Sequence, residues 1–125
     1  MFGFDGFPYL LNQLLNTHNK TLGGVKVFNY AQNANHIASN YSESHLYYPK
    51  TCRFEQLKKS FPHIVVLMFG GMDTRFEGYT DKTFIADYSK FIKEIEDLPT
   101  KPVVFLLTPL FQHRRGEDGR YIRET

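Results

Sequence analysis

The sequence predicts an α/β protein in which helices cover both faces of an open parallel sheet, a three-layer α/β/α sandwich. Extended apolar segments alternate along the chain with amphipathic segments of helical period, which is the order of βαβ units. The run at 64–69, Ile-Val-Val-Leu-Met-Phe, is continuously apolar, as expected of a strand buried on both faces of a parallel sheet.

The first half of the chain contains two helical segments and one extended segment. Apolar residues recur at spacings of three and four over 7–17, which predicts a helix. The segment 25–30 is rich in β-branched and aromatic residues and predicts a strand. A short helix is expected at 33–40, followed by an irregular segment at 41–50.

The second half carries the clearest elements. A helix is predicted over 52–60, ended by Pro62. The strand at 64–69 follows, and then a helix over 82–97 with Asp81 as its N-cap. Residues 103–107 form a second apolar run and the expected last strand, before a polar remainder at 108–125.

Three strands are few for such a sheet, and the first helix has no strand before it. We therefore expect residues 1–125 to form a single partial domain that lacks its first strand and its C-terminal portion.

Composition excludes several classes of partner. A net charge of +2 is too mild for a nucleic-acid-binding protein, and no apolar stretch approaches the roughly 20 residues of a membrane-spanning helix. The single Cys52 cannot form an internal disulfide, which suits a reducing compartment. The first residues carry no basic segment before an apolar run, so we expect no signal peptide. We predict an intracellular, cytoplasmic protein that binds neither nucleic acid nor membrane.

The five histidines predict no metal site. None has the spacing of a metal pair with another His, Cys or carboxylate on one helix face, and His36 is expected on the short polar helix at 33–40. We predict neither a metal nor a cofactor.

Polar and glycine residues follow the expected strands. In open α/β sheets, sites form where the C-terminal ends of strands meet the following loops. Alone, each segment has an ordinary interpretation: Gly70-Gly71 as a tight turn and Asp73 as a cap of its own turn. The candidate site residues are Asn29, Asn33, Ala34, Gly70, Gly71, Met72, Asp73 and Thr108.

Together these segments resemble the SGNH (GDSL) hydrolase family, in order and at similar spacing. Residues 7–11, Phe-Pro-Tyr-Leu-Leu, resemble the start of the helix after the family's nucleophile strand. Residues 29–34 resemble its second block, and residues 61–73 its third, an apolar strand followed by Gly-x-Asn-Asp. The helix with Tyr88 and the strand ending at Thr108-Pro109 also have counterparts. The resemblance covers nearly the whole chain and implies a flavodoxin-like sheet and a serine esterase ancestry.

Checked position by position, the resemblance leaves no catalytic residue intact. The nucleophile segment would precede Phe7, whereas the first serine in the chain is Ser39. The second-block glycine falls on Ala34, and the oxyanion-binding asparagine falls on Met72, which has no N–H to donate. Loss of one such donor costs about 10²–10³ in rate. The Asp-x-x-His block is missing.

Three functions remain in competition. The first is a catalytically inactive SGNH hydrolase-like domain that serves as a structural or binding component of a larger protein assembly, because an incomplete sheet needs a partner over its exposed edge. A cytoskeletal or ciliary lattice would provide such a partner. The alternative is part of an active SGNH serine esterase acting on acyl or acetyl esters, with its nucleophile and Asp-x-x-His segments outside this chain. The third possibility does not use the resemblance: the chain is a small α/β binding domain of flavodoxin-like type. No Gly-rich phosphate loop supports this possibility.

Overall fold

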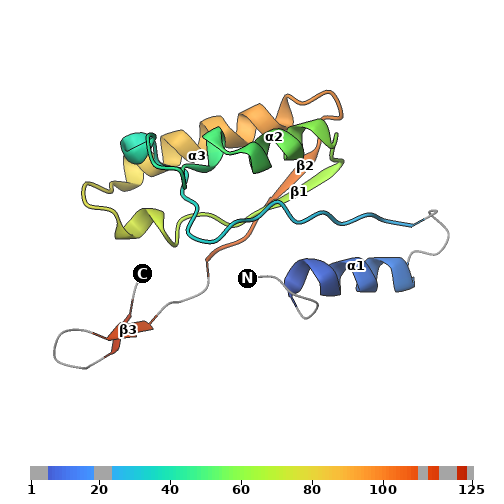
Figure 1. Ribbon diagram of the computed structural model, residues 1–125, viewed down its shortest axis with the longest axis horizontal. Coiled ribbons are helices and arrows are strands. Elements are labelled where there is room, and N and C mark those ends of the chain that lie inside the picture. Colours follow the sequence, from blue (N-terminus) through green and yellow to red (C-terminus); the bar gives the residue numbers. More distant parts are fainter. Residues whose placement is uncertain (1–5, 19–23, 110–112, 116–120, 124–125) are drawn as a thin grey trace. The chain divides into compact units, whose positions relative to one another are not determined.

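The computed structural model describes residues 6–18, 24–109, 113–115 and 121–123. The chain divides into two units, residues 1–34 and residues 35–125, and each is described by itself. Over the described residues the fold is mixed α/β, with three α-helices, a two-stranded parallel sheet and a two-stranded antiparallel hairpin (Figure 1).

The first unit consists of a helix and an extended segment. Helix α1 (Phe7–His18) confirms the helix predicted over 7–17, and Pro8 stands in its first turn, where a missing N–H leaves no helical hydrogen bond unmade. Residues 25–30 are not in a strand, so that prediction is wrong.

Side chains of α1 explain why residues 25–27 need no neighbouring strand. The Val25 amide donates to Asn16 Oδ1 at 2.8 Å, and Asn16 Nδ2 donates to the Val25 carbonyl at 2.7 Å. The Val27 amide donates to Asn12 Oδ1 at 3.3 Å. The side-chain amides of Asn12 and Asn16 thus make the hydrogen bonds that a neighbouring strand would otherwise make with this backbone.

The second unit is built on one βαβ arrangement. Strands β1 (Ile64–Leu67) and β2 (Val103–Leu106) pair in parallel, from Ile64 opposite Val103 to Leu67 opposite Leu106. Helix α3 (Asp81–Glu96) lies between them in the chain. Both predicted strands and the helix between them are therefore confirmed, with the strands shorter than expected.

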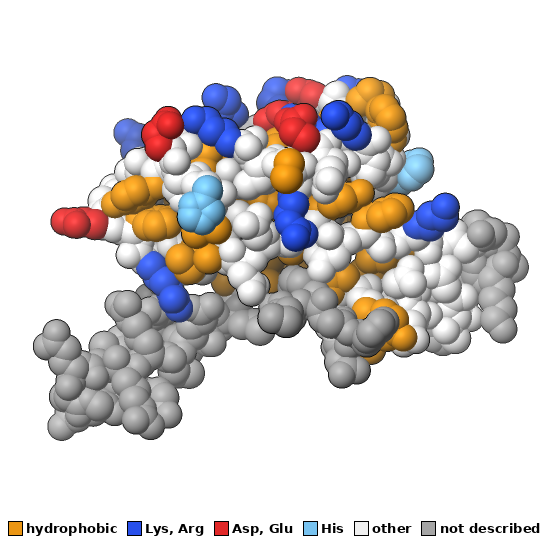
Figure 2. Space-filling model, in the orientation of Figure 1, with side chains coloured by type: hydrophobic (Ala, Val, Ile, Leu, Met, Phe, Trp, Pro, Cys, Tyr) orange, Lys and Arg blue, Asp and Glu red, His pale blue; other side chains and the backbone are white. Residues whose placement is uncertain are grey.

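Two helices cover one face of this sheet. Helix α2 (Cys52–Lys59) and α3 lie side by side (Figure 1). Phe54 of α2 and Phe91 of α3 contact each other, with their ring centroids 4.7 Å apart. Phe54, Phe91 and Ile95 of the helices are buried in the core, as are Val65 and Leu67 of β1. Charged side chains gather on the outer side of the helices (Figure 2), as in an amphipathic layer.

The opposite face of the sheet is apolar and exposed. Ile64 and Val66 are 61% and 41% exposed, whereas Val65 and Leu67 between them are buried. On β2, Val103 and Phe105 are 57% and 53% exposed. The expectation of a strand buried on both faces is therefore wrong, because helices of this unit cover one face only.

Thr80, not Asp81, is the N-cap of α3. The Thr80 hydroxyl accepts a hydrogen bond from the Thr83 amide at 3.2 Å. Asp81 is the first helical residue, and its carboxylate accepts from the Tyr79 hydroxyl at 2.9 Å. The helix starts one residue earlier than predicted, and a hydroxyl instead of a carboxylate accepts the hydrogen bond of the Thr83 amide.

The segment before α2 contains no α-helix at 33–40, contrary to prediction, and only residues 39 and 40 belong to a single-turn 3-10 helix. His36 forms an isolated parallel bridge with Tyr47, in which its amide donates to Leu46 O and its carbonyl accepts from Tyr48 N, both at 3.0 Å. Two single-turn 3-10 helices, η2 (Ser39–Tyr41) and η3 (Tyr48–Lys50), interrupt the otherwise irregular chain.

The C-terminal region holds a short hairpin. Strands β3 (His113–Arg115) and β4 (Tyr121–Arg123) pair in antiparallel fashion, with His113 opposite Arg123. This hairpin lies in the segment expected only to be polar. Across the residues that the structure describes, every helix is too short or too polar to cross a membrane.

Candidate functional site

The end of β1 leads through a glycine turn into the 3-10 helix η4 (Asp73–Arg75). Gly70 has φ +119°, a backbone conformation that glycine adopts without strain. A Cβ atom there would lie 3.4 Å from Phe84 Cζ and 3.5 Å from Pro109 Cγ. The loop after β1 therefore lies against α3 and against the segment after β2, so these two strand ends lie close together.

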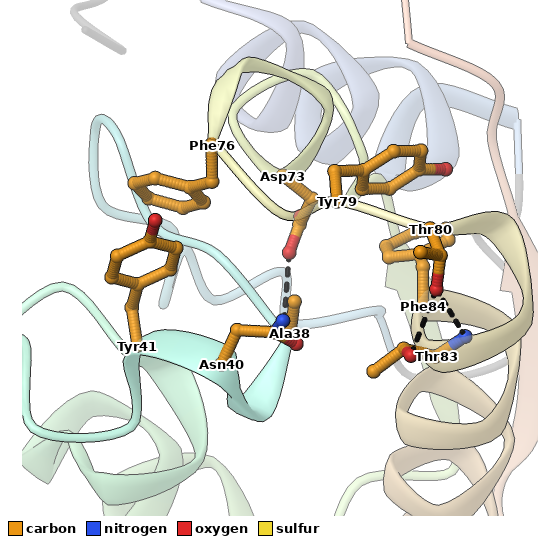
Figure 3. A pocket seen from close by; sticks show the side chains of 9 residues that line it. All are labelled: Ala38, Asn40, Tyr41, Asp73, Phe76, Tyr79, Thr80, Thr83 and Phe84. Atoms are coloured by element: carbon orange, nitrogen blue, oxygen red, sulfur yellow. Dashed lines mark hydrogen bonds between the residues drawn. The ribbon is translucent and has the colours of Figure 1, made fainter.

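Asp73 is the polar centre of this loop and is fully buried. Its Oδ1 accepts the amide of Ile37 at 2.9 Å and the amide of Ala38 at 2.7 Å, and Figure 3 shows the bond to Ala38. Its Oδ2 has no hydrogen-bond partner among the described residues. Hydrogen bonds to a carboxylate are stronger than neutral ones, so Asp73 fixes a distant segment in place. The expectation that it caps its own turn misses this contact.

A second carboxylate continues the same pattern. Asp87 Oδ2, from α3, accepts the Ser39 amide at 2.7 Å and the Ser39 hydroxyl at 2.9 Å. Three consecutive amides, those of Ile37, Ala38 and Ser39, are thus bound by carboxylates of other elements. We call this arrangement, made of Asp73, Asp87 and residues 37–39, the carboxylate clamp.

His36 precedes the clamp and is the residue that sequence reasoning misplaced. It is fully buried outside any helix, with its ring centroid 4.7 Å from that of Phe76 and 5.6 Å from that of Tyr47. Neither ring nitrogen has a hydrogen-bond partner among the described residues. Burial lowers the pKa of His36, while the nearby charge of Asp73 and the backbone of Ala38 act in the opposite direction. No local pattern in the sequence signals this burial.

A small cavity opens beside the clamp. It has room for about 10 Å³, which is about one water molecule. In Figure 3 the rings of Tyr41 and Phe76, 4.5 Å apart, form one wall, and the hydrogen-bonded hydroxyls of Thr80 and Thr83 lie on the other side. The lining residues are Ala38, Asn40, Tyr41, Asp73, Phe76, Tyr79, Thr80, Thr83 and Phe84. Sites for small organic ligands need about 300 Å³ or more, so this cavity cannot hold one.

The other predicted residues of this loop offer little chemistry. Met72 is half-buried, with its carbonyl accepting from the Arg75 amide at 3.1 Å. The Gly71 carbonyl accepts from the Thr74 hydroxyl at 3.2 Å. Thr108, after β2, is exposed. Of this group, only Asp73 directs a charged side chain inward.

The remaining predicted residues belong to the first unit. Asn29 Oδ1 accepts from the Ala31 amide at 3.0 Å, which is a local turn contact, and Asn33 is exposed. Ala34 has φ +64°, a left-handed conformation that costs about 1–2 kcal/mol for a residue with a Cβ atom. This is the position where the SGNH resemblance places a glycine.

Two tyrosines near the clamp are held in the neutral form. Burial, followed by the contact with Asp81, raises the pKa of Tyr79 to about 12. Burial also raises the pKa of Tyr88. Neither hydroxyl is therefore suited to act as a base near neutral pH.

Within the part of the chain that the structure describes, no group of three His, Cys, Asp or Glu side chains is placed to hold a metal ion. No protein-family model, curated protein or solved structure matches the chain.

Proposed function

We propose that this protein is a catalytically inactive domain of the SGNH hydrolase type, with a three-layer α/β/α architecture, that serves as a structural or binding component of a cytoplasmic protein assembly. One observation carries the inactive part of the proposal. At the end of β1, where an ester hydrolase of this type needs hydrogen-bond donors, the chain has Met72 and a buried carboxylate that binds its own backbone.

Ester hydrolysis requires a nucleophile, a base within hydrogen-bond reach of it, and donors about 3 Å from the developing oxyanion. The thioether of Met72 donates no hydrogen bond, and Asp73 Oδ1 already accepts two amides. The His36 ring is fully buried between aromatic side chains. A cavity with room for one water molecule leaves no space for an acyl group.

The exposed face of the sheet supports the binding part of the proposal. Val66, Met68, Val103 and Phe105 are each at least 41% exposed. Parallel strands in proteins are normally covered on both faces, and contiguous exposed apolar surface commonly marks an interaction site. A protein partner that covers this face would bury it.

Turnover of an activated ester tests the inactive part. We expect 4-nitrophenyl acetate to be hydrolysed no faster in the presence of the purified chain than in that of a catalytically inert protein at equal concentration. Met72→Asn restores the one donor that can be replaced by a single substitution, and it should add nothing. Saturable hydrolysis by the wild-type chain, increased by Met72→Asn, would establish the esterase instead.

Site-directed photo-crosslinking tests the binding part in cells of the native source. A photoreactive residue at Phe105, on the apolar face, should cross-link to one discrete protein species. The same residue at Lys90, which is exposed on α3, is the control and should not give that product. The binding role is wrong if Phe105 yields no product, or the same products as Lys90.

A further inference from the structure

Backbone groups on the outer edge of β2 point away from the rest of the sheet. The amides of Val103 and Leu107 donate to carbonyls at the two ends of β1, at 3.0 and 2.8 Å. Successive residues of a strand direct their N–H and C=O groups to opposite sides, so those of Val104 and Leu106 point away from β1. Within the described part of the chain, β1 is the one strand that pairs with β2. The outer edge therefore offers two N–H and two C=O groups to another strand.

Apolar side chains flank this edge on both faces of the sheet. Leu106, on the side of the helices, is 54% exposed, although Leu67, opposite it on β1, is buried. Phe105, on the other face, is 53% exposed. Helices α2 and α3 thus cover β1 but leave the end of β2 open. A strand added beside β2 would bury apolar surface on both faces.

The edge lacks the features that keep exposed sheet edges from pairing with other chains. Such edges usually carry charged residues, proline or a bulge. Residues 103–107 are Val-Val-Phe-Leu-Leu, and β2 follows β1 in unbroken register. Pro102 and Pro109 lie outside this run. The composition of β2 therefore favours pairing with a further strand.

We propose that β2 pairs in antiparallel fashion with β2 of a second copy of this chain, so that the two sheets form one continuous sheet. A two-fold axis at the edge brings the same strand of each copy side by side in opposite directions. The register that uses both outward-pointing residues sets Val104 of each copy opposite Leu106 of the other. Phe105 then lies on the axis, opposite the second copy's Phe105. This inference rests on the proposed binding role and names the partner.

Two identical edges fit each other in side-chain chemistry as well as in hydrogen bonding. Residues 103–109 contain no charged side chain, so no like charges meet across the axis, where they would oppose pairing. Lys101, just before the strand, falls opposite Pro109 of the second copy in this register. The central pair of Phe105 side chains is an aromatic cross-strand pair, which stabilises a sheet.

Engineered cysteines test the pairing and its register in the full chain carrying Cys52→Ser. Phe105→Cys should form an intermolecular disulfide under mild oxidation, because its Cα atom and that of its counterpart would lie about 4.5 Å apart, within the range that a disulfide requires. Val103→Cys, comparably exposed on the same face, is the control. Its counterpart would lie about 13 Å away along the strands, so it should form little disulfide. Equal yields in the two variants, or no disulfide in either, would overturn the proposal.

Sedimentation velocity measures whether the unmodified chain pairs. Its mass should rise from 14.6 kDa to twice that value as protein concentration increases. Phe105→Lys should stay monomeric, because it places two like charges opposite each other on the axis. Ile64→Lys, comparably exposed on the same face but on β1, should form dimers as the wild type does. Loss of the dimer in Ile64→Lys as well would place the contact on the sheet face and contradict pairing at the edge.

The identity of the cross-linked protein separates this inference from the proposed binding role. A photoreactive residue at Phe105 should give a product of twice the chain mass in cells, which supports both. A product with a different protein, from a chain that sediments as a monomer at every concentration, would overturn the second copy as partner and leave the binding role standing. No product at all in cells would overturn both.

Discussion

The carboxylate of Asp73 accepts the backbone amide of Ala38 at 2.7 Å, across 35 residues of sequence. This contact joins the loop after β1 to a segment without regular secondary structure. It fixes that segment more firmly than a local turn could, because a buried charged acceptor is costly to leave unpaired.

Removing the charge at this contact should lower stability. Asp73→Asn keeps the shape of the side chain but weakens two charge-assisted hydrogen bonds, so we expect a loss of about 1–3 kcal/mol in the free energy of unfolding. Urea denaturation followed by circular dichroism measures it. Glu77→Gln, at an exposed carboxylate, should change stability by less than about 0.5 kcal/mol. Equal losses of stability in the two variants would show that the hydrogen bonds of Asp73 do not stabilise the fold.

Glycine at position 34 should stabilise the protein. Ala34 has φ +64°, so glycine relieves the strain of a Cβ atom there. The greater flexibility of glycine in the unfolded chain offsets part of this gain, which leaves about 0.5–1 kcal/mol. Ala38→Gly is the matched control, because Ala38 is buried at φ −66°, and it should destabilise. Thermal melts of the two variants should shift in opposite directions.

Substitutions at Thr80 and Asp81 should lower stability in different ways, because only Thr80 is the N-cap of α3. Thr80→Ala removes the hydroxyl that accepts the Thr83 amide and should cost about 1 kcal/mol. Asp81→Ala loses a favourable charge in the first turn, about 0.3–1 kcal/mol, and this part of the loss shrinks in salt. It also removes the acceptor of the Tyr79 hydroxyl, a loss that salt changes less. Denaturation at low and high ionic strength measures both. A salt-independent loss at Asp81 that exceeds the loss at Thr80 would restore Asp81 as the cap.

Alkaline conditions should weaken the region around Tyr79. Its pKa is raised to about 12 by burial and by the contact with Asp81, against an ordinary value of 10.0. A raised pKa in the folded state gives stability that is complete below pH 10 and is lost as pH rises towards 12. Tyrosinate absorbance during alkaline titration should therefore lose its latest-titrating component in Tyr79→Phe. An unchanged late component would mean that another tyrosine produces it.

The helices and the parallel pair could be predicted because their signals are local. The spacing of Phe84, Tyr88 and Phe91 marks one face of α3, and the apolar runs mark β1 and β2. The segment 25–30 has the composition of a strand but is bonded to Asn12 and Asn16 of α1 instead. Composition indicates that a segment can be extended, but it does not indicate which groups will form hydrogen bonds with its backbone.

The candidate site could be located from the sequence but not understood from it. The turn at Gly70 and the position of Asp73 after a strand are visible as a pattern. That Asp73 binds Ile37 and Ala38, and that His36 is buried beside them, depends on contacts over 35 residues or more that leave no periodic trace. No α-helix forms at 33–40 for the same reason, because long-range hydrogen bonds to Asp73 fix the backbone of residues 37 and 38.

The absence of a catalytic serine is tested most directly by the intact mass of the purified chain after incubation with a serine-directed fluorophosphonate. The proposal of an inactive domain predicts an unchanged mass, even though the Ser39 hydroxyl donates to a carboxylate, that of Asp87. Stoichiometric addition of one fluorophosphonate group, lost in Ser39→Ala or in the variant of whichever serine carries it, would contradict the proposal and identify the nucleophile.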